Sequence, residues 1–442
     1  MGAGIAQLAC LGRFETFLHD PLAAALDAGA TRLREALVTG SDRGRWSAGA
    51  AEAAAARLRV APELDDLAGC DLVIEAAPED LELKRELFAQ VAGICGAEAV
   101  LATNTSSLSV TAIASGVERP ERVCGMHFFN PPALMRLVEV VAGGETSEET
   151  LAIVEDVAGA MGRQPIRAAD SIGFVANRCA RPFTLEALRL LGDRVATHEQ
   201  IDRIVRIGGG FRMGPFELMD LVGVDVNFEV AKSFWEQSFH EPRWQPHPIQ
   251  VRMVAAGRLG RKAGRGYYEY GRGTHRPDDP EPPARAPDWA RNADVEDSVH
   301  FVAFPSLEEA RVVELARRPA TAPADAEGAE AYFRAMGKHV EWVGDAPGLV
   351  LGRILAQVVN EAHFAVGEGV ATREDVDTAM RLGFNYPRGP FEWSEAIGAA
   401  RVVSVLDALH SELGEERYRV APLLRLAARE STPQPPARSP RE

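Results

Sequence analysis

The segment 123–141 carries one histidine and one glutamate, His127 and Glu139, whose side chains together could form an acid–base pair. Apolar runs at 122–129 and 137–141 flank a proline-containing turn, and this pattern predicts two strands folded back on each other. An imidazole accepts a proton near neutral pH, and a carboxylate at its other nitrogen fixes the tautomer and stabilises the cation. Taken singly, His127 would more often be an interior histidine and Glu139 an exposed strand residue, so the interpretation depends on the surrounding elements.

Those elements alternate between strand and helix up to about residue 170, which predicts an α/β domain with a mostly parallel sheet. After that the pattern is helical to about residue 257. The expected strands are 14–18, 71–76, 100–103 and 164–167, and the expected helices are 2–10, 22–37, 47–58, 147–161 and 174–191, with one more starting at 78–80.

Polar residues follow several of these strands. Asp20 comes after the first strand, Glu79 after the second and Ser106 after the third. Open parallel sheets bind ligands at the carboxyl ends of their strands, so these side chains are candidates for a ligand site. Taken alone, Glu79 and Ser106 would each more often be a helix cap.

The start of the chain resembles the second half of a dinucleotide-binding βαβ unit. Gly2 and Gly4 open a helix, and the following strand ends at Asp20, the position of an acid that binds ribose hydroxyls. No strand precedes Gly2. We therefore expect the first strand of the sheet and the first two glycines of the phosphate turn to be missing from this chain, as after a start codon assigned too late, with weak NAD binding and low stability if the protein begins here.

Composition narrows the function classes. The formal net charge of −16 argues against a general nucleic-acid surface. Five cysteines at scattered positions, without metal-ligand spacing, predict reduced thiols in a cytoplasmic protein and no metal site. No apolar run reaches membrane-spanning length and no signal peptide precedes the first helix, so we expect no membrane association.

A long internal repeat shapes the second half of the sequence. Residues 155–223 align without a gap on 330–398, and Asn177 of the first copy is replaced by Gly352 of the second. We expect a Rossmann-like domain at 1–170, helical domains at 171–270 and 330–420 that repeat each other, a linker at 271–329 and a disordered tail at 421–442. The protein is then either a homodimer or a monomer in which the second copy replaces a dimer partner.

Six motifs in order resemble those of the L-3-hydroxyacyl-CoA dehydrogenase family. They are Gly-Met-His-Phe-Phe-Asn-Pro, Leu-Val-Glu-Val-Val, Ile-Glu-Ala-Ala-Pro-Glu-Asp, Asn-Thr-Ser-Ser, Gly-Phe-Val-Ala-Asn-Arg and Gly-Arg-Lys-Ala-Gly-Arg-Gly-Tyr-Tyr. The resemblance covers residues 1–270 closely and 330–410 through the repeat. It implies oxidation of an (S)-3-hydroxyacyl-CoA to a 3-oxoacyl-CoA with NAD, in fatty-acid or aromatic-acid degradation.

The resemblance also implies a role for each site residue. His127 would be the general base, oriented by Glu139, and Ser106 and Asn177 would bind the substrate hydroxyl and thioester. CoA phosphates would lie near Arg43 and Arg45. The residues implied in binding NAD are Gly2, Gly4, Asp20, Glu79, Lys84, Asn104, Ser106 and Asn130.

Two other functions compete with this hypothesis. A non-catalytic CoA-thioester-binding or structural relative would have kept the fold and lost the cofactor turn, and it would bind CoA thioesters without NADH turnover. The presence of all four residues His127, Glu139, Ser106 and Asn177 argues against it, because an inactive site has no need of them. A dehydrogenase of free hydroxy acids fits less well with the His–Glu hairpin and the helical arm after Arg45.

Overall fold

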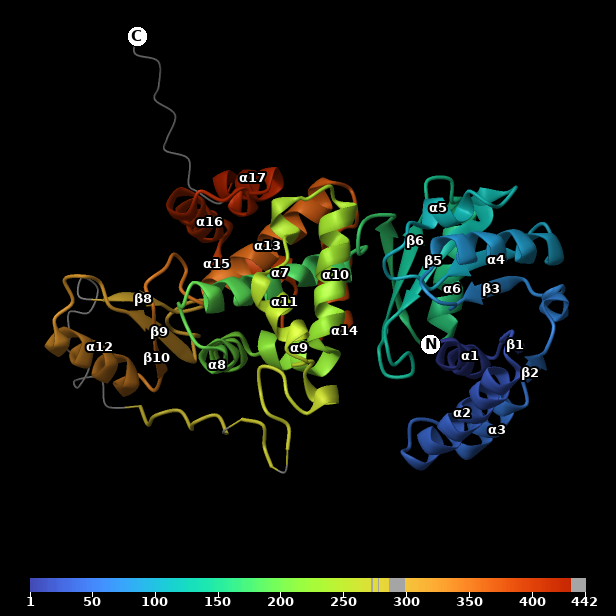
Figure 1. The fold of residues 1–442 in the computed structure, drawn as a ribbon, viewed down its shortest axis with the longest axis horizontal. Helices are drawn as coiled ribbons and strands as arrows, with labels where there is room; N and C mark the ends of the chain where they lie inside the picture. Colours follow the sequence, from blue (N-terminus) through green and yellow to red (C-terminus); the bar gives the residue numbers. More distant parts are fainter. Residues whose placement is uncertain (272, 277, 286–298, 431–442) are drawn as a thin grey trace, which may run out of the picture. The chain divides into compact units, whose positions relative to one another are not determined.

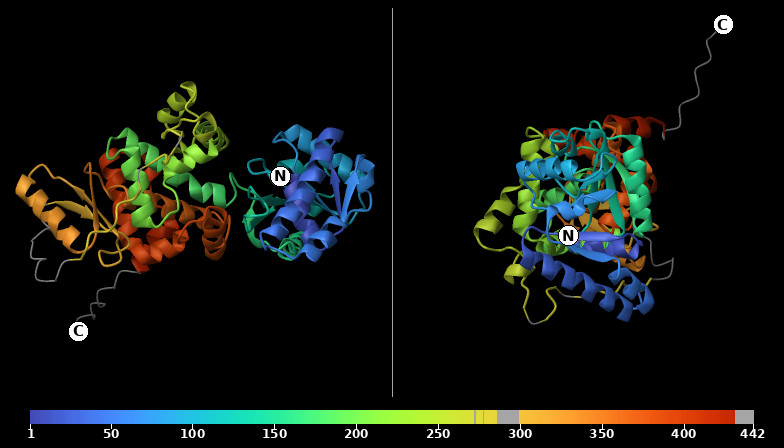
Figure 2. Two further views of the ribbon diagram at one scale, coloured as in Figure 1. Left: turned by 90° about the horizontal axis from the view of Figure 1, so that it is seen from below. Right: turned by 90° about the vertical axis from the view of Figure 1, so that its right-hand side faces the viewer.

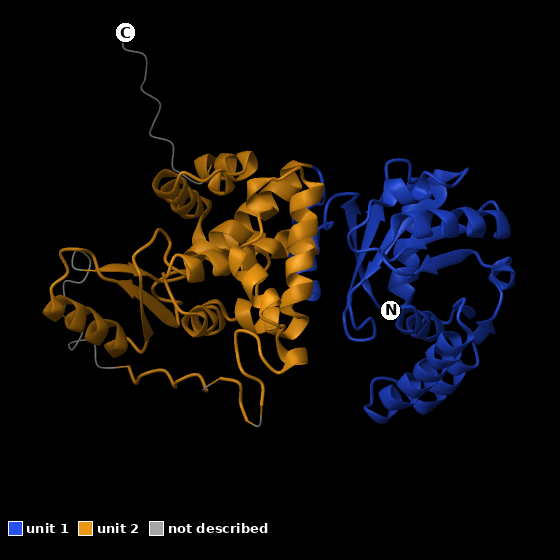
Figure 3. Ribbon diagram, viewed as in Figure 1, with its two compact units in different colours: residues 1–176, 369–384 blue, residues 177–368, 385–442 orange. Residues whose placement is uncertain are grey.

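The computed structural model describes residues 1–271, 273–276, 278–285 and 299–430. The chain forms two compact units (Figures 1 and 3). The first contains Met1–Ala176 together with Gly369–Phe384, and the second contains Asn177–Glu368 and Asn385–Glu442. A short piece of the second sequence repeat therefore belongs to the first unit.

The first unit contains a five-stranded sheet in the order β3-β4-β5-β6-β7, parallel except for the antiparallel pair β5 and β6. Its strands are β3 (Leu72–Glu75), β4 (Val100–Thr103), β5 (Val123–Phe128), β6 (Leu137–Ala142) and β7 (Gln164–Ala169). A separate parallel pair is formed by β1 (Thr16–His19) and β2 (Leu58–Ala61). In the part of the chain that the structure describes, no strand is hydrogen-bonded between β1 and β3.

Helices cover both faces of the five-stranded sheet. Successive strand residues point to opposite sides, and both sides carry apolar side chains that the helices bury. The apolar stripes of α1 (Gly2–Leu11) and α6 (Glu148–Ala160) pack on one face, around residues such as Met126 and Val140. Helix α4 (Leu81–Ile94) and the short α5 (Val110–Ala114) pack on the other, around Leu101 and Val123. This is the two-layered cover of a doubly wound fold.

The arm of the first unit is a pair of helices, α2 (Ala23–Asp42) and α3 (Ala48–Ala55), that extends from the rest of the unit (Figures 1 and 2). Ser47 caps α3, since its hydroxyl accepts the Ala50 N–H at 3.2 Å. The helix predicted over 47–58 ends earlier, because Leu58 begins strand β2 beside β1.

The second unit is mainly helical. Its helices are α7 (Ala176–Gly192, whose first residue belongs to the first unit), α8 (His198–Gly209), α9 (Pro215–Val222), α10 (Val224–Gln237), α11 (Pro248–Ala255), α13 (Leu351–Gly367), α15 (Pro390–Ile397), α16 (Ala399–Leu413) and α17 (Pro422–Glu430). Helix α14 (Arg373–Gly383), from the second copy of the repeat, belongs to the first unit.

A small α/β module interrupts this helical unit. Strands β8 (His300–Val302) and β9 (Val312–Ala316) pair antiparallel, and β9 pairs in parallel with β10 (His339–Val343) across α12 (Pro323–Ala335). The interval 271–329 is therefore not a linker throughout, and the second copy at 330–420 is not all-helical. Short strands between proline-rich and acidic residues gave too weak a periodicity to be recognised.

The chain end also differs from the expectation for 421–442. Helix α17 occupies Pro422–Glu430, and its buried Leu424 and Ala428 anchor it. Residues 431–442 of the expected tail lie outside the described residues. Among the helices that the structure describes, none is long and apolar enough to cross a membrane.

Candidate active site

His127 and Glu139 face each other on neighbouring strands. The antiparallel register of β5 and β6 places the two residues directly opposite, so their side chains leave the same face of the sheet. His127 Nδ1 lies 2.6 Å from Glu139 Oε2, and the residues are 6% and 0% exposed. A bond of this length between a ring nitrogen and a buried carboxylate holds the imidazole in one orientation.

The second oxygen of Glu139 is also fixed. Oε1 accepts the backbone N–H groups of Val175 at 3.0 Å and Ala176 at 2.8 Å, where the chain enters α7. Three hydrogen bonds therefore satisfy a carboxylate that is fully removed from solvent. Because both oxygens are engaged, the carboxylate cannot rotate away from His127.

Aromatic rings surround the imidazole. The Phe129 ring centroid lies 4.6 Å from that of His127, and the Phe174 ring 5.9 Å. Phe129 in turn meets Phe384 edge-on at 6.3 Å. With Nδ1 bound to Glu139, Nε2 is the nitrogen left without a hydrogen-bond partner among the described residues, and it is free to exchange a proton.

Asn104 and Ser106 follow β4. Asn104 Oδ1 accepts the Phe128 N–H at 2.8 Å, which ties the end of β4 to the end of β5, one residue beyond His127. Ser106 is exposed, and its hydroxyl has no hydrogen-bond partner among the described residues. The two residues thus lie at the carboxyl edge of the sheet, where open α/β sheets bind ligands.

Glu79 organises the loop that contains Ser106. Its Oε1 accepts the backbone N–H groups of Ser106 at 3.1 Å and Ser107 at 3.2 Å, and the hydroxyls of Thr105 at 2.5 Å and Ser107 at 2.8 Å. Burial acts to raise the pKa of Glu79, but the hydrogen bonds from Thr105, Ser107 and the Ser106 N–H together with the Lys84 charge outweigh it and lower the pKa. Glu79 is therefore a carboxylate at neutral pH.

Lys84 lies beneath this loop rather than at its surface. The residue is 1% exposed, and its Nζ lies 2.6 Å from Glu75 Oε1 and 3.5 Å from Glu79 Oε2. Thr103 donates to the other oxygen of Glu75 at 2.7 Å. Sequence reasoning missed Glu75 and Thr103, although both sit at the last positions of strands β3 and β4, where a polar residue in an apolar run is a visible signal.

The first turn of α1 approaches the same region of the first unit. A Cβ added at Gly2 would lie 3.8 Å from the Ala76 side chain, just after β3, and one added at Gly4 would lie 3.2 Å from Pro132. Asp20 follows β1, and its Oδ1 accepts the Leu22 N–H at 3.0 Å. Its other oxygen has no partner among the described residues. A helix N-terminus without side chains and an acid after a strand fit a dinucleotide.

Arg43 and Arg45 lie on the turn between α2 and α3. Both are exposed, and neither forms an ion pair among the described residues. The turn is fixed by Trp46, whose Nε1 donates to the Leu37 carbonyl at 2.8 Å and whose ring would overlap any Cβ at Gly40. Two unpaired cations on a rigid turn suit phosphate groups.

The structure does not bring together every predicted site residue. Asn130 is exposed after β5 and has no side-chain hydrogen bond among the described residues. Asn177 is the second residue of α7 and belongs to the second unit, whereas His127, Glu139 and Ser106 belong to the first. Asn177 directly follows Ala176, the residue whose N–H binds Glu139.

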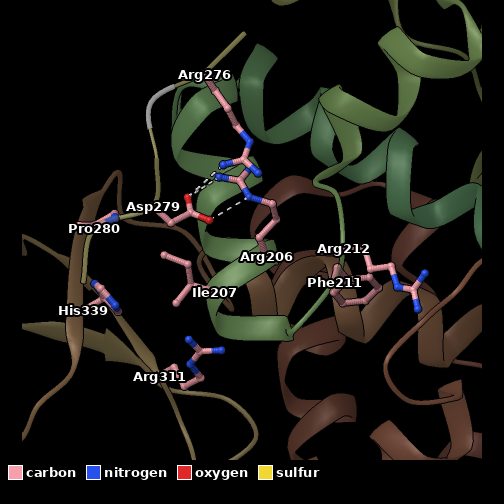
Figure 4. A pocket seen from close by; sticks show the side chains of 9 residues that line it. All are labelled: Arg206, Ile207, Phe211, Arg212, Arg276, Asp279, Pro280, Arg311 and His339. Atoms are coloured by element: carbon pink, nitrogen blue, oxygen red, sulfur yellow. Dashed lines mark hydrogen bonds and ion pairs between the residues drawn. The ribbon is translucent and has the colours of Figure 1, made fainter. Parts of the chain in front are cut away.

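A cavity of about 230 Å³ in the second unit contains none of the predicted site residues (Figure 4). Two of its arginines share the Asp279 carboxylate: Arg206 bonds it at 2.6 Å and Arg276 lies 3.6 Å from it, and Arg206 also bonds Glu217 at 2.9 Å. The residues lining it are Arg206, Ile207, Phe211, Arg212, Arg276, Asp279, Pro280, Arg311 and His339.

Comparison with known proteins decides the family. The NAD binding domain of 3-hydroxyacyl-CoA dehydrogenase matches residues 1–171, and the C-terminal domain of 3-hydroxyacyl-CoA dehydrogenase matches residues 173–270 and 348–434. The chain belongs to the 3-hydroxyacyl-CoA dehydrogenase family. It is an NAD-dependent oxidoreductase that interconverts 3-hydroxyacyl-CoA and 3-oxoacyl-CoA. The expected family, fold class and cofactor are confirmed.

Individual relatives agree with this assignment. The chain is 38% identical to a 3-hydroxyadipyl-CoA dehydrogenase of Escherichia coli, over 97% of this chain and 95% of the relative. A crystal structure of 3-hydroxybutyryl-CoA dehydrogenase from Escherichia coli matches with a TM-score of 0.90 and 37% identity, over 97% of this chain and 96% of that one. A probable 3-hydroxybutyryl-CoA dehydrogenase of Deinococcus radiodurans is 39% identical, over 61% of this chain and 96% of the relative.

Proposed function

We propose that His127 is the general base of the dehydrogenase and that Glu139 orients it. In the oxidation direction Nε2 takes the proton of the substrate 3-hydroxyl as a hydride leaves C3 and the carbonyl forms. NAD supplies the hydride acceptor. Glu139 keeps the Nδ1–H tautomer and stabilises the imidazolium. The observation that carries this proposal is the 2.6 Å contact between the imidazole and a buried carboxylate whose two oxygens are both fixed.

The remaining polar residues are proposed to position the substrate and the cofactor. Ser106, with a free hydroxyl on a loop tied down by Glu79, would bond the reacting oxygen, and Asn177 would bond the thioester. Positioning of this kind accounts for a large share of catalysis, whereas a base alone contributes about 10²–10⁴-fold. The cofactor residues are proposed to be Gly2, Gly4, Asp20, Glu79, Asn104, Ser106 and Asn130, with Lys84, paired with the Glu79 carboxylate, acting through it.

For the substrate we propose a short acyl chain, with a terminal carboxylate as a second possibility. The relatives that match nearly the whole chain, with both copies of the helical domain, are named for 3-hydroxyadipyl-CoA and 3-hydroxybutyryl-CoA. Such thioesters arise in fatty-acid and aromatic-acid degradation. Arg43 and Arg45, exposed and unpaired, are proposed to attract the CoA phosphates. None of the five cysteines forms a disulfide among the described residues, which suits a reducing cytoplasm.

A substrate panel tests the proposal. The full chain is assayed with NAD and (S)-3-hydroxybutyryl-CoA, 3-hydroxyadipyl-CoA and a long-chain 3-hydroxyacyl-CoA, and NADH formation is followed by absorbance. We expect the highest kcat/KM for one of the two short substrates. A long-chain preference would overturn the assignment of chain length, and a preference for the free hydroxy acid over its CoA ester would overturn the substrate class.

A further inference from the structure

The second copy of the repeat extends further toward the N-terminus than the sequence alignment indicates. The module β8-β9-α12-β10 pairs its strands as β5-β6-α6-β7 does, antiparallel and then parallel. Glu314 on β9 stands 175 residues after Glu139. It accepts the N–H groups of Val350 at 2.6 Å and Leu351 at 3.1 Å, just as Glu139 binds the residues that begin α7. The duplicated unit therefore includes the half of the sheet that carries the active-site hairpin.

The two copies exchange elements reciprocally. In the first unit, the Ala169 N–H after β7 donates to the Val370 carbonyl of the second copy at 2.8 Å. In the second unit, the Gly344 N–H after β10 donates to the Val195 carbonyl of the first copy at 2.6 Å. These four positions correspond at the constant spacing of 175 residues.

Buried ion pairs repeat the same exchange in the second unit. Arg178 on α7 bonds Glu361 on α13 at 2.8 Å, and Arg353 on α13 bonds Glu186 on α7. Both arginines and both glutamates correspond at the same spacing. Each copy thus contributes its arginine to the glutamate of the other copy. Such reciprocal contacts are the pattern of an isologous dimer, formed here within one chain.

Through this exchange α14 of the second copy packs on β6 and β7, the strands beside the His–Glu pair. The approach is close at Gly383, where an added Cβ would lie 2.8 Å from Leu137 and 3.4 Å from Phe129. The next residue, Phe384, lies edge-on to Phe129, with 6.3 Å between ring centroids and 77° between planes. Phe129 is the ring that lies 4.6 Å from His127.

The contact between Phe384 and Phe129 has no counterpart at the corresponding positions of the other copy. The position that corresponds to Phe384 in the first copy is Gly209, and the position that corresponds to His127 in the second copy is Val302. Gly352 of the second copy replaces Asn177 of the first, and a Cβ at Gly352 would overlap the ring of Phe304. The second sheet is therefore filled at this point and has a valine, not a proton acceptor, opposite Glu314, so Phe384 is not a general feature of the repeat.

We propose that Phe384 is a positioning residue, contributed by the second copy of the repeat, that holds Phe129 against the imidazole of His127. This inference rests on the proposed role of His127 as the base. The edge of the Phe384 ring limits the space into which Phe129 can turn, and Phe129 limits the rotation of the imidazole about its bond to Glu139. The second copy thereby completes in one chain a wall of the active site.

The test compares three variants of the full chain. Phe384→Ala removes the ring, Phe384→Tyr keeps it, and Phe301→Ala is the matched control, a phenylalanine of β8 whose ring centroid lies 5.2 Å from that of Phe333, in the sheet where Val302 stands in place of His127. We expect Phe384→Ala to lower kcat by about tenfold, as for a modest misplacement of a catalytic group, with KM for NADH changed less than about twofold. Phe384→Tyr and Phe301→Ala should keep kcat.

A spectroscopic readout separates positioning from folding. In nitrogen-detected NMR of histidine-labelled chain, the His127 ring signals of Phe384→Ala should broaden or report mixed tautomers, whereas those of Phe301→Ala should match the wild type. If kcat and the His127 signals of Phe384→Ala equal those of Phe301→Ala, the inference is wrong. If Phe384→Ala does not fold, Phe384→Leu takes its place with the same two outcomes. Failure of the proposed function is seen separately, because the His127→Ala variant would then be as active as the wild type.

Discussion

Replacement of Glu139 by glutamine isolates the orienting carboxylate. Glutamine has the same size, so its oxygen can still accept the N–H groups of Val175 and Ala176. Its NH₂ group must then face His127 Nδ1, because the opposite placement would set donor against donor at the start of α7. Nδ1 is forced to accept, and the proton moves to Nε2, which can no longer take the hydroxyl proton of the substrate.

The size of the effect follows from the contact that is lost. A buried hydrogen bond between a charged pair contributes about 1.5–3 kcal/mol, which corresponds to about 10- to 100-fold in rate at about 1.4 kcal/mol per tenfold. The wrong tautomer adds to this, and in a serine protease the same exchange of carboxylate for amide lowers kcat about 10⁴-fold. We therefore expect kcat of Glu139→Gln to fall by about 10²–10⁴-fold with little change in KM for NADH.

Glu314 provides an internal control for this variant. It accepts the two corresponding backbone N–H groups at the start of α13, one on each oxygen, and faces Val302 instead of a histidine. Glu314→Gln should keep the wild-type kcat when acetoacetyl-CoA reduction is followed by NADH absorbance. The reasoning is refuted if Glu139→Gln keeps more than about a tenth of the wild-type kcat, or if Glu314→Gln loses as much as Glu139→Gln.

Three further predictions concern other charged groups. Burial raises the pKa of Glu314 to about 8. Between about pH 5 and pH 8 the folded chain therefore keeps a proton that the unfolded chain releases, and the free energy of unfolding falls as pH rises. In urea titrations Glu314→Gln should reduce this fall, and the same dependence of the free energy on pH in the variant and the wild type would contradict the prediction. The double variant Arg43→Ala/Arg45→Ala should raise KM for the CoA thioester by about 3- to 10-fold at low salt and less at high salt, with Arg32→Ala as the exposed control; a salt-independent effect would refute the electrostatic role. Asp20→Ala should increase kcat/KM with NADP relative to NAD by about tenfold, because a carboxylate repels the 2′-phosphate, and an unchanged ratio would argue against ribose binding by Asp20.

Periodicity and chemistry predicted the core of the first unit. The apolar runs around His127 and Glu139 became β5 and β6, and the proline turn between them allowed the antiparallel register that brings the pair together. Ser47 and Ser147 cap α3 and α6 where a helix was expected to begin. These features depend on local sequence, so a single chain is enough to predict them.

The module around Glu314 could not be predicted in the same way. Strands β8 and β9 are short, and a buried glutamate in β9 conceals an otherwise apolar run. The signal that could have found them is the repeat itself, since Leu137-Val138-Glu139 corresponds to Val312-Val313-Glu314 at the spacing of 175. The gapless match of 155–223 with 330–398 does not reach these strands, because the linker-like composition after residue 271 conceals the continuation of the repeat.

Contacts between distant segments were also beyond the sequence. Phe384 is 255 residues from Phe129, and no local pattern connects them. The burial of Lys84 between Glu75 and Glu79 was likewise not visible, because an exposed lysine one turn into a helix is the ordinary expectation. Both depend on tertiary packing, which a single sequence does not specify.

The central claim is that one imidazole, held by a buried carboxylate, moves the proton in this dehydrogenase. Its most direct test is kcat of His127→Ala for oxidation of the best 3-hydroxyacyl-CoA of the panel, with His339→Ala, a strand histidine of the second unit, as the control. We expect His127→Ala to lose at least about 10²-fold in kcat while still binding NADH, and His339→Ala to keep it. Wild-type turnover by folded His127→Ala would contradict the account.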